Sequence, residues 1–473
     1  MGGEVRLGDV AKVQGGFAFR SKDFEPVGIP VVKIKNVRKR DVDLTEVDCV
    51  SENIAKRCLN FYVRKGDVLI SMTGSGPNAP ASIVGRVARH TGEDADFLIN
   101  QRVGRFVNKD TQKLDLRYLY YFLSQFTVQD YLVSIATGSA NQVNISAAQI
   151  ESLNVSLPVL NVQKAIAHIL GSLDDKIELN HQMNTTLEAM AQALFKSWFV
   201  DFDPVIDNAL AAGNPIPEPL QARAETRKAL GGKRKPLPKA IQQQFPSCFV
   251  LSEEMGWIPE GWEEVRVKDI AKVIKGKSYK SSELEESKTA LVTLKSFNRG
   301  GGYRLDGLKE YTGTFKHEQE VFAGDLIIAY TDVTQAADVI GKPAMVVSDS
   351  RYEHLVVSLD VSVVRPAVDA HKYFLYGIAQ TERFQDHTYS HSTGTTVLHL
   401  GKNAVPEYLI ALPDEELVNT FVKIAEPTFQ LIDKQIAEIG QLSMLRDTLL
   451  PKLLSGQLRV SDIKLQLTGG PGQ

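Results

Sequence analysis

A series of short segments occurs twice in this chain, in the same order and about 260 residues apart. EVRLGDVAKV at residues 4–13 returns as EVRVKDIAKV at residues 264–273, with seven of ten residues identical. Further pairs keep the order: VVKIKNV and LVTLKSF, KGDVLIS and AGDLIIA, SIVGR and DVIGK, RYLYYFLSQ and KYFLYGIAQ, and SLNVSLP and YLIALP. Chance similarity would not preserve this order. The chain is therefore a diverged duplication, and both copies are expected to fold in the same way.

The repeated segments predict the same strands and helices in both copies. VVKIKNV, DVLIS and SIVGRV are rich in β-branched residues and bounded by Gly, Pro, Asn or Asp, which is typical of strands. The apolar residues of DLRYLYYFLSQF recur at helical spacing, and Asp115 stands where it can cap that helix. Each copy, residues 1–158 and residues 263–412, is therefore predicted to form an α+β domain of ordinary size.

Each copy is followed by a long amphipathic segment, residues 159–202 and residues 413–460, that predicts a helix. Apolar residues recur three or four positions apart in both segments, a spacing typical of coiled coils. Asn180 and Asn184 fall on the apolar seam of the first helix, where buried polar residues can fix the register. Pro427 and Pro451 are expected to kink or end the second helix. Over residues 162–200 the first helix would be about 58 Å long.

Two segments belong to neither copy. Residues 203–262 are rich in proline and contain the basic stretch GGKRKP, a composition that predicts an extended, partly helical connector. Residues 461–473 form a tail that ends in TGGPGQ, and this end is expected to be either disordered or an addition to the folded protein.

Composition argues against several classes of protein. The net charge of −3 does not suit a chain that coats nucleic acid by bulk charge, although residues 1–157 carry 20 Lys and Arg against 17 Asp and Glu. Cys49, Cys58 and Cys248 are too few and too scattered for a disulfide framework or a cysteine zinc site. The sequence has no long apolar run and no secretory signal at its N-terminus, which predicts a cytoplasmic protein.

Four further segments resemble a known family. They are LGSLDDKIELN at residues 170–180, LEAMAQALFKSWFVDFDPV at residues 187–205, GWIPEGWE at residues 256–263 and LRDTLLPKLLSGQLRV at residues 445–460. Together with the order of domain, long helix, connector, domain and long helix, they make the chain similar to the specificity (S) subunit of type I restriction-modification enzymes, the HsdS family. The resemblance extends over about residues 4–460.

The resemblance implies a fold, a function and partners. The fold is two similar target recognition domains separated by two long antiparallel coiled-coil helices. The function is non-catalytic recognition of double-stranded DNA, in which each domain reads one half of a bipartite target. The partners are two modification (methyltransferase) subunits, which bind S-adenosylmethionine, and two restriction (ATP-dependent translocase/nuclease) subunits. The helices would set the spacer length and dock the modification subunits. Trp198 and Phe199 would pack either between the helices or against a modification subunit.

Basic and polar loops at equivalent places in the two copies are candidate DNA contacts, because Arg suits guanine, Asn and Gln suit adenine, and Ser and Thr suit bases or phosphate. On a strand, Lys33 and Lys35 would project to one side. The first copy offers Lys33, Lys35, Arg38, Lys39, Arg40, Ser75, Asn78, Gln101, Arg102, Ser139, Asn141 and Gln142. The second copy offers Lys295, Asn298, Arg299, Thr331, Thr334, Gln335, Ser392, Thr393 and Thr395. The alternative for each residue is a solvated surface or turn position.

Two other functions stay open: a self-contained DNA methyltransferase, and a protein scaffold that does not contact DNA. The sequence has no Asn-Pro-Pro-Tyr/Phe motif for adenine methylation, and His387 and His391 lack a third metal ligand at suitable spacing. We therefore expect the chain itself to carry no catalytic group, no metal and no cofactor. A scaffold would account for the helices but not for the polar loops.

Overall fold

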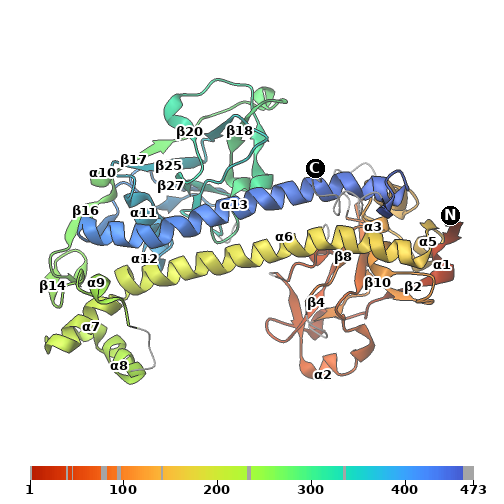
Figure 1. Cartoon of the computed structure of the whole chain (residues 1–473), viewed down its shortest axis with the longest axis horizontal. Coiled ribbons are helices and arrows are strands. Elements are labelled where there is room, and N and C mark those ends of the chain that lie inside the picture. The colour runs from red at the N-terminus through yellow and green to blue at the C-terminus, as the bar shows by residue number, and fades with distance from the viewer. Residues whose placement is uncertain are drawn as a thin grey trace, which may run out of the picture. The chain divides into compact units, whose positions relative to one another are not determined.

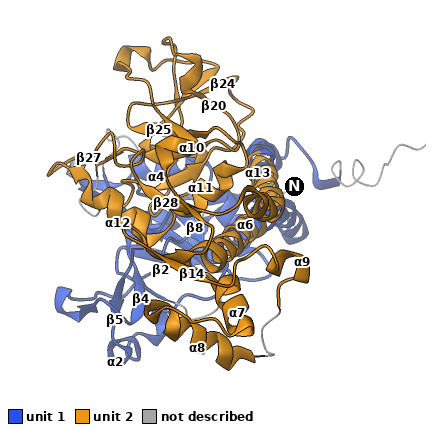
Figure 2. Ribbon diagram, turned by 90° about the vertical axis from the view of Figure 1, so that its left-hand side faces the viewer, with its two compact units in different colours: residues 1–177, 441–473 blue, residues 178–440 orange. Residues whose placement is uncertain are grey.

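The computed structural model describes residues 3–38, 41–44, 46–75, 83–92, 97–139, 142–231, 236–333 and 337–461. The chain divides into two compact units, residues 1–177 with 441–473 (unit 1) and residues 178–440 (unit 2), which Figure 2 shows in different colours. Each unit contains one copy of the repeat together with one part of each of two long helices.

The domain of unit 1 is built from small sheets. β1 (Gly3–Arg6) pairs antiparallel with β13 (Asn154–Leu157), so the two ends of the copy meet. One four-stranded sheet has the order β2-β10-β6-β8, from Ala11–Gly15, Val103–Asn108, Val68–Ser71 and Val87–Arg89. The other has the order β3-β5-β4-β9, from Phe24–Glu25, Asp48–Val50, Ile29–Val32 and Leu98–Ile99. A three-stranded sheet has the order β11-β12-β7, from Thr137–Ser139, Gln142–Asn144 and Thr73–Gly74.

Unit 2 repeats this set of sheets. β16 (Glu263–Arg266) pairs with β28 (Leu409–Leu412). The sheet β17-β25-β21-β23 comes from Ala271–Lys275, Val361–Pro366, Leu326–Ala329 and Pro343–Met345. The sheet β19-β18-β24-β20 comes from Lys309–Glu310, Thr289–Val292, His354–Val357 and Glu320–Val321. The sheet β22-β27-β26 comes from Thr331–Asp332, Leu398–Leu400 and Ser392–Thr393. β4 with β9 and β18 with β24 are equivalent parallel pairs, so the predicted duplication is confirmed in the topology.

Equivalent helices cover the sheets. They are α1 (Leu7–Val10) and α10 (Val267–Ile270), α3 (Leu116–Leu123) and α11 (His371–Ala379), and α4 (Phe126–Ser134) and α12 (Glu382–Ser390). Unit 1 adds α2 (Glu52–Ala55) and α5 (Ala147–Glu151). As predicted, Asp115 caps α3, because its carboxylate accepts the N–H of Tyr118 at 2.8 Å. α3 buries Tyr118 and Leu119 in the core of unit 1, and each such buried side chain contributes about 1.5–3 kcal/mol.

The two long helices are α6 (Leu160–Phe195), which continues as a π-helical turn over Lys196–Val200, and α13 (Glu415–Leu454) (Figure 1). In unit 2, buried Asn180 donates through Nδ2 to Oε2 of Glu438 at 2.8 Å, and Gln435 contacts Met183. The number of the α13 partner falls as the α6 number rises, so the helices run antiparallel, as the family resemblance implied. No helix in the described part of the chain is long and apolar enough to cross a membrane.

The prediction that Pro427 or Pro451 could end the second helix is wrong, because α13 continues through both residues to Leu454. Pro427 lies on the exposed face of the helix, where the carbonyl that loses its N–H partner can be hydrated. Before Pro427 the helix is held by Phe421 and Ala425, which are buried in the core of unit 2, and after it by Phe429, which packs against the same core. This packing offsets the lost hydrogen bond.

The aromatic end of α6 packs into a domain core. Trp198 is 1% exposed, and the ring centroid of Phe199 lies 5.2 Å from that of Phe374 in α11. In unit 1, Leu450 and Leu453 near the end of α13 join the core in the same way. The rings of Trp198 and Phe199 also lie 6.2 and 5.3 Å from that of Phe421 in α13. The expected packing between the two helices is therefore confirmed, and the structure adds that it forms part of the core of the second domain.

The connector is folded rather than extended. It forms α7 (Asp203–Ala212), α8 (Gln221–Leu230), α9 (Lys239–Gln242) and the hairpin of β14 (Phe249–Ser252) and β15 (Gly256–Pro259). Phe245 and Trp262 from this region are buried in the core of unit 2. Arg227 Nη2 donates to Asp207 Oδ2 at 2.5 Å and links α8 to α7. The expectation of partial helicity is confirmed, but the connector is a structural part of unit 2.

Candidate nucleic-acid interface

The basic segment after β4 bends instead of continuing as a strand. β4 ends at Val32, and Ile34–Asn36 form a 3₁₀ turn, so the predicted alternation of Lys33 and Lys35 on a strand is wrong. The cause is Asn36, which is buried. Its Oδ1 accepts the Lys33 N–H at 3.0 Å, and its Nδ2 donates to carbonyls of the loop that follows.

The cations of this segment differ in what they contact. Lys33 Nζ lies 2.7 Å from Asp48 Oδ2 and 3.8 Å from the ring centroid of Phe24. The hydrogen bond from Lys33 lowers the pKa of Asp48, so this lysine is engaged within the domain. Lys35 is exposed. Arg38 Nε lies 3.1 Å from Asp43 Oδ2, but the arginine side chain is 59% exposed, and such a surface pair is weak enough to give way to a ligand.

The same turn occurs in unit 2, where Leu294–Ser296 form the 3₁₀ turn and the hydroxyl of Ser296 accepts the N–H of Thr293. Lys295 on this turn is exposed, as are Asn298 and Arg299 in the loop that follows. The Asn298 N–H donates to the Gly302 carbonyl at 2.9 Å and closes this loop. Lys295, Asn298 and Arg299 therefore lie on one exposed turn and loop, as the sequence predicted.

In unit 1 the small sheet β11-β12-β7 joins two of the predicted polar segments. The Thr73 hydroxyl donates to Oδ1 of Asn144 at 2.6 Å across β7 and β12. Ser75 follows directly after β7, Ser139 lies in β11, and Gln142 in β12 is exposed. Segments whose contacting residues are 71 positions apart in the sequence thus lie side by side through strand pairing.

The equivalent sheet β22-β27-β26 of unit 2 places its candidates unequally. Thr331 is only 6% exposed and is paired in β22, so the structure does not present it to a ligand. Ser392 donates its hydroxyl to the Thr388 carbonyl at 2.7 Å. Thr393 and Thr395 are exposed. Of these candidates, the two exposed threonines are the best placed for contact with DNA.

The turn with Gln101 and Arg102 links the two parts of the candidate interface of unit 1. Both residues are exposed. The carbonyl of Arg102 accepts the N–H of Met72 at 2.9 Å, at the end of β6, and the N–H of Asn100 donates to the Val32 carbonyl at 3.0 Å, at the end of β4. The basic segment after β4, the segment after β6 and this turn therefore share one end of the domain. Six candidates, Lys39, Arg40, Asn78, Asn141, Thr334 and Gln335, and the side chain of Ser139 lie outside what the structure describes.

Two cations of this region were not among the sequence candidates. Arg86 and Lys342 stand in the SIVGR and DVIGK blocks, where the sequence predicted a strand. The strands begin only after these residues, because Gly85 and Gly341 adopt φ values of 70° and 69° and form turns. The signal that could have revealed them is the repeat itself, since both copies keep a glycine followed by a cation.

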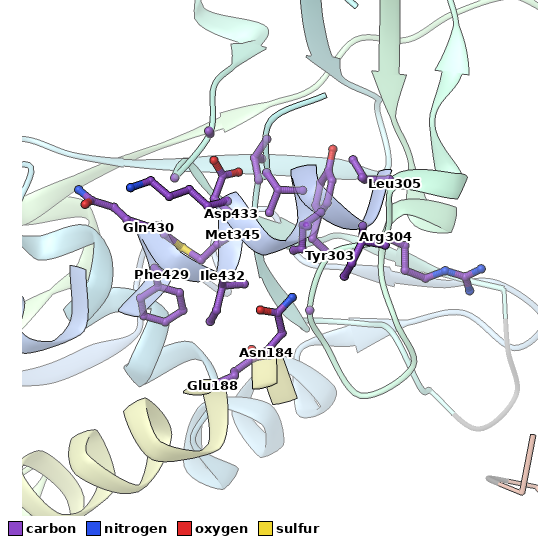
Figure 3. Close-up of a pocket in the computed structure, with 18 of the residues that line it drawn as sticks. Asn184, Glu188, Tyr303, Arg304, Leu305, Met345, Phe429, Gln430, Ile432 and Asp433 are labelled. Carbon is purple, nitrogen blue, oxygen red and sulfur yellow. The ribbon is translucent and has the colours of Figure 1, made fainter. Parts of the chain in front are cut away.

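A cavity of about 710 Å³ lies within unit 2 between α6, α11, α13 and the loop that carries Asn298. Figure 3 shows Asn184 and Glu188 on its α6 side and Tyr303 and Met345 across from them. Glu188 accepts the Tyr376 hydroxyl at 2.5 Å, and burial together with the Glu188 charge raises the pKa of this tyrosine. Glu188 therefore has a packing role. Among the described residues, no group of three or more metal-ligating side chains occurs.

Comparison with known proteins agrees with this geometry. The family model described as type I restriction modification DNA specificity domain matches residues 3–189 and 259–441, one match in each copy. The chain is 26% identical over 368 residues to the type I restriction enzyme HindI specificity subunit of Haemophilus influenzae. This match covers 72% of the chain and 77% of the relative. It is 25% identical over 427 residues to the MjaIX specificity subunit of Methanocaldococcus jannaschii, with 88% and 82% covered.

A solved structure supports the fold independently. The S subunit of a type I restriction-modification system from M. genitalium superposes on the chain with a TM-score of 0.52 and 16% identity, and the match covers 95% of each chain. Because the family model matches both copies of the repeat, the chain belongs to the type I restriction modification DNA specificity family and is a DNA specificity subunit of such a system.

Proposed function

We propose that each domain reads one half of a bipartite DNA target. The observation that carries this proposal is that equivalent loops have the same backbone but different side chains. The turn with Gln101 and Arg102 in unit 1 corresponds to Leu359 and Asp360 in unit 2. Gln101 and Leu359 donate their N–H groups to the carbonyls of Phe17 and Lys277, which stand at equivalent places after β2 and β17. An arginine suits guanine, whereas a carboxylate accepts from the amino group of cytosine, so the two halves would read different bases.

The paired helices are the proposed docking surface for the modification subunits, and they set the spacing between the half-sites. Support comes from apolar side chains that α6 and α13 leave exposed although both helices are already packed within the chain. These residues are Val162, Leu179, Met183, Met190, Ile424, Leu431, Met444 and Leu445. Apolar side chains that stay exposed on helices already packed within the chain are candidates for contact with a partner protein. Two modification subunits and two restriction subunits complete the proposed assembly.

The chemistry is proposed to reside on these partners. The modification subunits bind S-adenosylmethionine and methylate one adenine in each half-site, while this chain holds them in register with the target. A direct test is to mix the purified chain with labelled S-adenosylmethionine, alone and with its modification subunit. Binding is expected only in the presence of the modification subunit. Binding by the chain alone would favour a self-contained methyltransferase instead.

The target itself is found by mapping methylated adenines in cells with and without the gene for this chain. One bipartite sequence, with a spacer of constant length, is expected to lose methylation when the gene is absent. An unchanged pattern, in cells that still make the modification subunit, would contradict the proposed function.

A further inference from the structure

In unit 1, Gly85 and Arg86 form a turn whose backbone is held by several hydrogen bonds. It lies next to the loops that carry the candidate DNA contacts. Gly85 has φ +70°, donates its N–H to the Ser71 carbonyl at 2.9 Å, and is followed by Arg86, whose carbonyl accepts the Ser71 N–H at 2.9 Å. Gln129 of α4 donates through Nε2 to the Val84 carbonyl at 3.2 Å and holds the turn from the other side. The backbone that carries Arg86 is therefore fixed by the strand and by the helix.

Unit 2 holds its turn by the same devices. Gly341 has φ +69° and donates its N–H to the Ala329 carbonyl at 2.9 Å, and the carbonyl of Lys342 accepts the Ala329 N–H at 3.1 Å. Gln385 of α12, which is equivalent to Gln129, donates to the Gly341 carbonyl at 3.0 Å. Two domains that have diverged at most positions thus keep the same turn and present a cation from the same place.

The two cations are half-buried, and in the part of the chain that the structure describes neither is paired with an acid in direct contact. Neither side chain forms a hydrogen bond or an ion pair with the described residues. Burial lowers the pKa of the Arg86 guanidinium, and the nearby charge of Arg38 acts in the same direction. Burial also lowers the pKa of Lys342, against the opposing charge of Asp338. Each cation is therefore already partly desolvated in the folded domain before any ligand is present. A bound anion would stabilise the charged form.

Both turns border the candidate reading loops. Ser71, which holds the first turn, ends β6 and is followed after one residue by β7, which leads to Ser75. The guanidinium of Arg38 is close enough to affect Arg86 electrostatically. In unit 2 the loop that carries Asn298 is tied to the second turn, because the Gly302 N–H donates to the Pro343 carbonyl at 3.0 Å. A DNA backbone that passes over either set of loops also passes over its turn.

We propose that Arg86 and Lys342 are equivalent phosphate contacts, one in each domain, that anchor the protein on the DNA backbone regardless of the base sequence. This inference rests on the proposed function and adds two positioning residues to it. Phosphate is favoured over a base because the position accepts either Arg or Lys. A phosphate binds both as charges, whereas bidentate recognition of guanine distinguishes the planar guanidinium from the ammonium group. Retention in both copies also suits a contact that does not depend on the target.

The test uses the full chain assembled with its modification subunits and carrying Arg86→Gln, Lys342→Gln, or both. Dissociation constants are measured for the natural target and for unrelated DNA across a range of salt concentrations. Each substitution is expected to weaken binding to both DNAs by a similar factor of about three to ten, and to reduce the slope of log affinity against log salt by about 0.9. The methylated sequence should stay the same, and Arg86→Lys should retain the wild-type slope.

The matched control is the pair Lys12→Gln and Lys272→Gln. These exposed lysines are also equivalent in the two copies. They pair with Val107 and Arg365, near the ends of β10 and β25, whereas the turns with Gln101 and Asp360 lie at the beginning of these strands. They are expected to leave affinity and slope unchanged.

Two outcomes would overturn the inference while leaving the proposed function intact. Relaxed preference at one base of the target would make the residue a base reader, and an unchanged slope would remove it from the interface. Should a glutamine variant fail to fold, single methylphosphonate replacements along the target are tested with the wild-type protein. One sensitive phosphate is expected beside each half-site, and its absence contradicts the inference. Failure of the wild-type assembly to prefer its methylated target would instead refute the proposed function.

Discussion

Arg38 and Arg299 lie in equivalent loops of the two domains, and each lies near a carboxylate. Arg38 pairs with Asp43 at 3.1 Å and is 59% exposed, while Arg299 lies 3.7 Å from Asp338 and is 63% exposed. These exposed pairs are worth about 0–1 kcal/mol, so either guanidinium can turn to a guanine edge at little cost.

Replacing Arg38 or Arg299 by alanine is expected to weaken binding to the natural target by about 1–3 kcal/mol and to relax one base position in the corresponding half-site. The measurement is a set of binding curves with targets that differ by single base pairs. A uniform loss over all targets with a smaller salt slope would identify a phosphate contact, and unchanged affinity would exclude the residue from the interface.

Asp203 is the buried charge on which the connector depends. Its carboxylate accepts hydrogen bonds from Arg223 Nε at 2.7 Å and from the Ser197 hydroxyl at 2.8 Å, and Arg227 lies 3.0 Å away. Burial alone would raise the pKa of Asp203, but these hydrogen bonds and positive charges outweigh burial and lower it. The ionised form is therefore the one that stabilises the fold.

Asp203→Asn is expected to lower the free energy of unfolding of unit 2 by about 2–3 kcal/mol at neutral pH. Because the folded pKa is depressed, this stabilisation is complete above the unfolded value of 3.8 and is lost as the pH falls below it through the folded pKa. Denaturant unfolding followed by tryptophan fluorescence measures the difference, with the exposed Glu225→Gln as the control. A difference as large at pH 3 as at pH 7 would contradict this explanation.

At the scale of the helices, polar pairs set the register of α6 against α13. Asn180 with Glu438 fixes it in unit 2, and Arg446 Nη1 with Asp174 Oδ1, at 2.6 Å, fixes it in unit 1. An insertion in one helix alone would separate these two pairs by the length of the insertion. A test of the helices as a spacer must therefore lengthen both.

Four residues inserted after residue 177 of α6, together with four inserted after residue 440 of α13, add about 6 Å to each helix and largely preserve its apolar face. With base pairs about 3.4 Å apart, the methylated target is expected to keep both half-sequences and to gain one or two base pairs of spacer.

Methylome sequencing of the double insertion checks this prediction. The insertion in α6 alone is the control, and it should lower stability because one polar pair loses its partner. A fully active double insertion with an unchanged spacer would show that the partner subunits set the distance.

At the scale of the whole molecule, each domain begins and ends in an equivalent antiparallel strand pair, which we call the seam. The Leu7 N–H donates to the Leu153 carbonyl at 2.8 Å beside the pair β1–β13, and the Val267 N–H donates to the Tyr408 carbonyl at 3.0 Å beside β16–β28. Everything between these hydrogen bonds can be exchanged without cutting a strand of the seam.

Replacing residues 7–153 by the matching domain of a relative is expected to change one half of the methylated sequence and to leave the other half unchanged. Replacing them by residues 267–408 of this chain should produce a target that contains the same half-sequence twice. The methylated sequence of each exchange reports the result. If both halves changed in the first exchange, or neither did, the two domains would not read DNA independently.

Much of this architecture could be predicted from local patterns. The duplication, the α+β class of each domain, the two long helices and the Asp115 cap follow from residue order, periodicity and capping, which need no distant partner. The positions of the loops and of several side chains could not be predicted. Asn36 bends the basic segment because its amide group meets carbonyls from a later loop, and Thr331 is buried because β22 pairs with β27.

By itself, the sequence determined that two related domains and two long helices would form and that the chain would serve DNA recognition, because duplication, spacing and family motifs are properties of residue order. The tertiary structure alone decided that α13 continues through Pro427, that Trp198 belongs to a domain core, and that Arg86 and Lys342 occupy equivalent turns. The physical reason is the same in each case. The free energies that settle these positions come from packing and hydrogen bonds between residues that are far apart in the chain and adjacent only after folding.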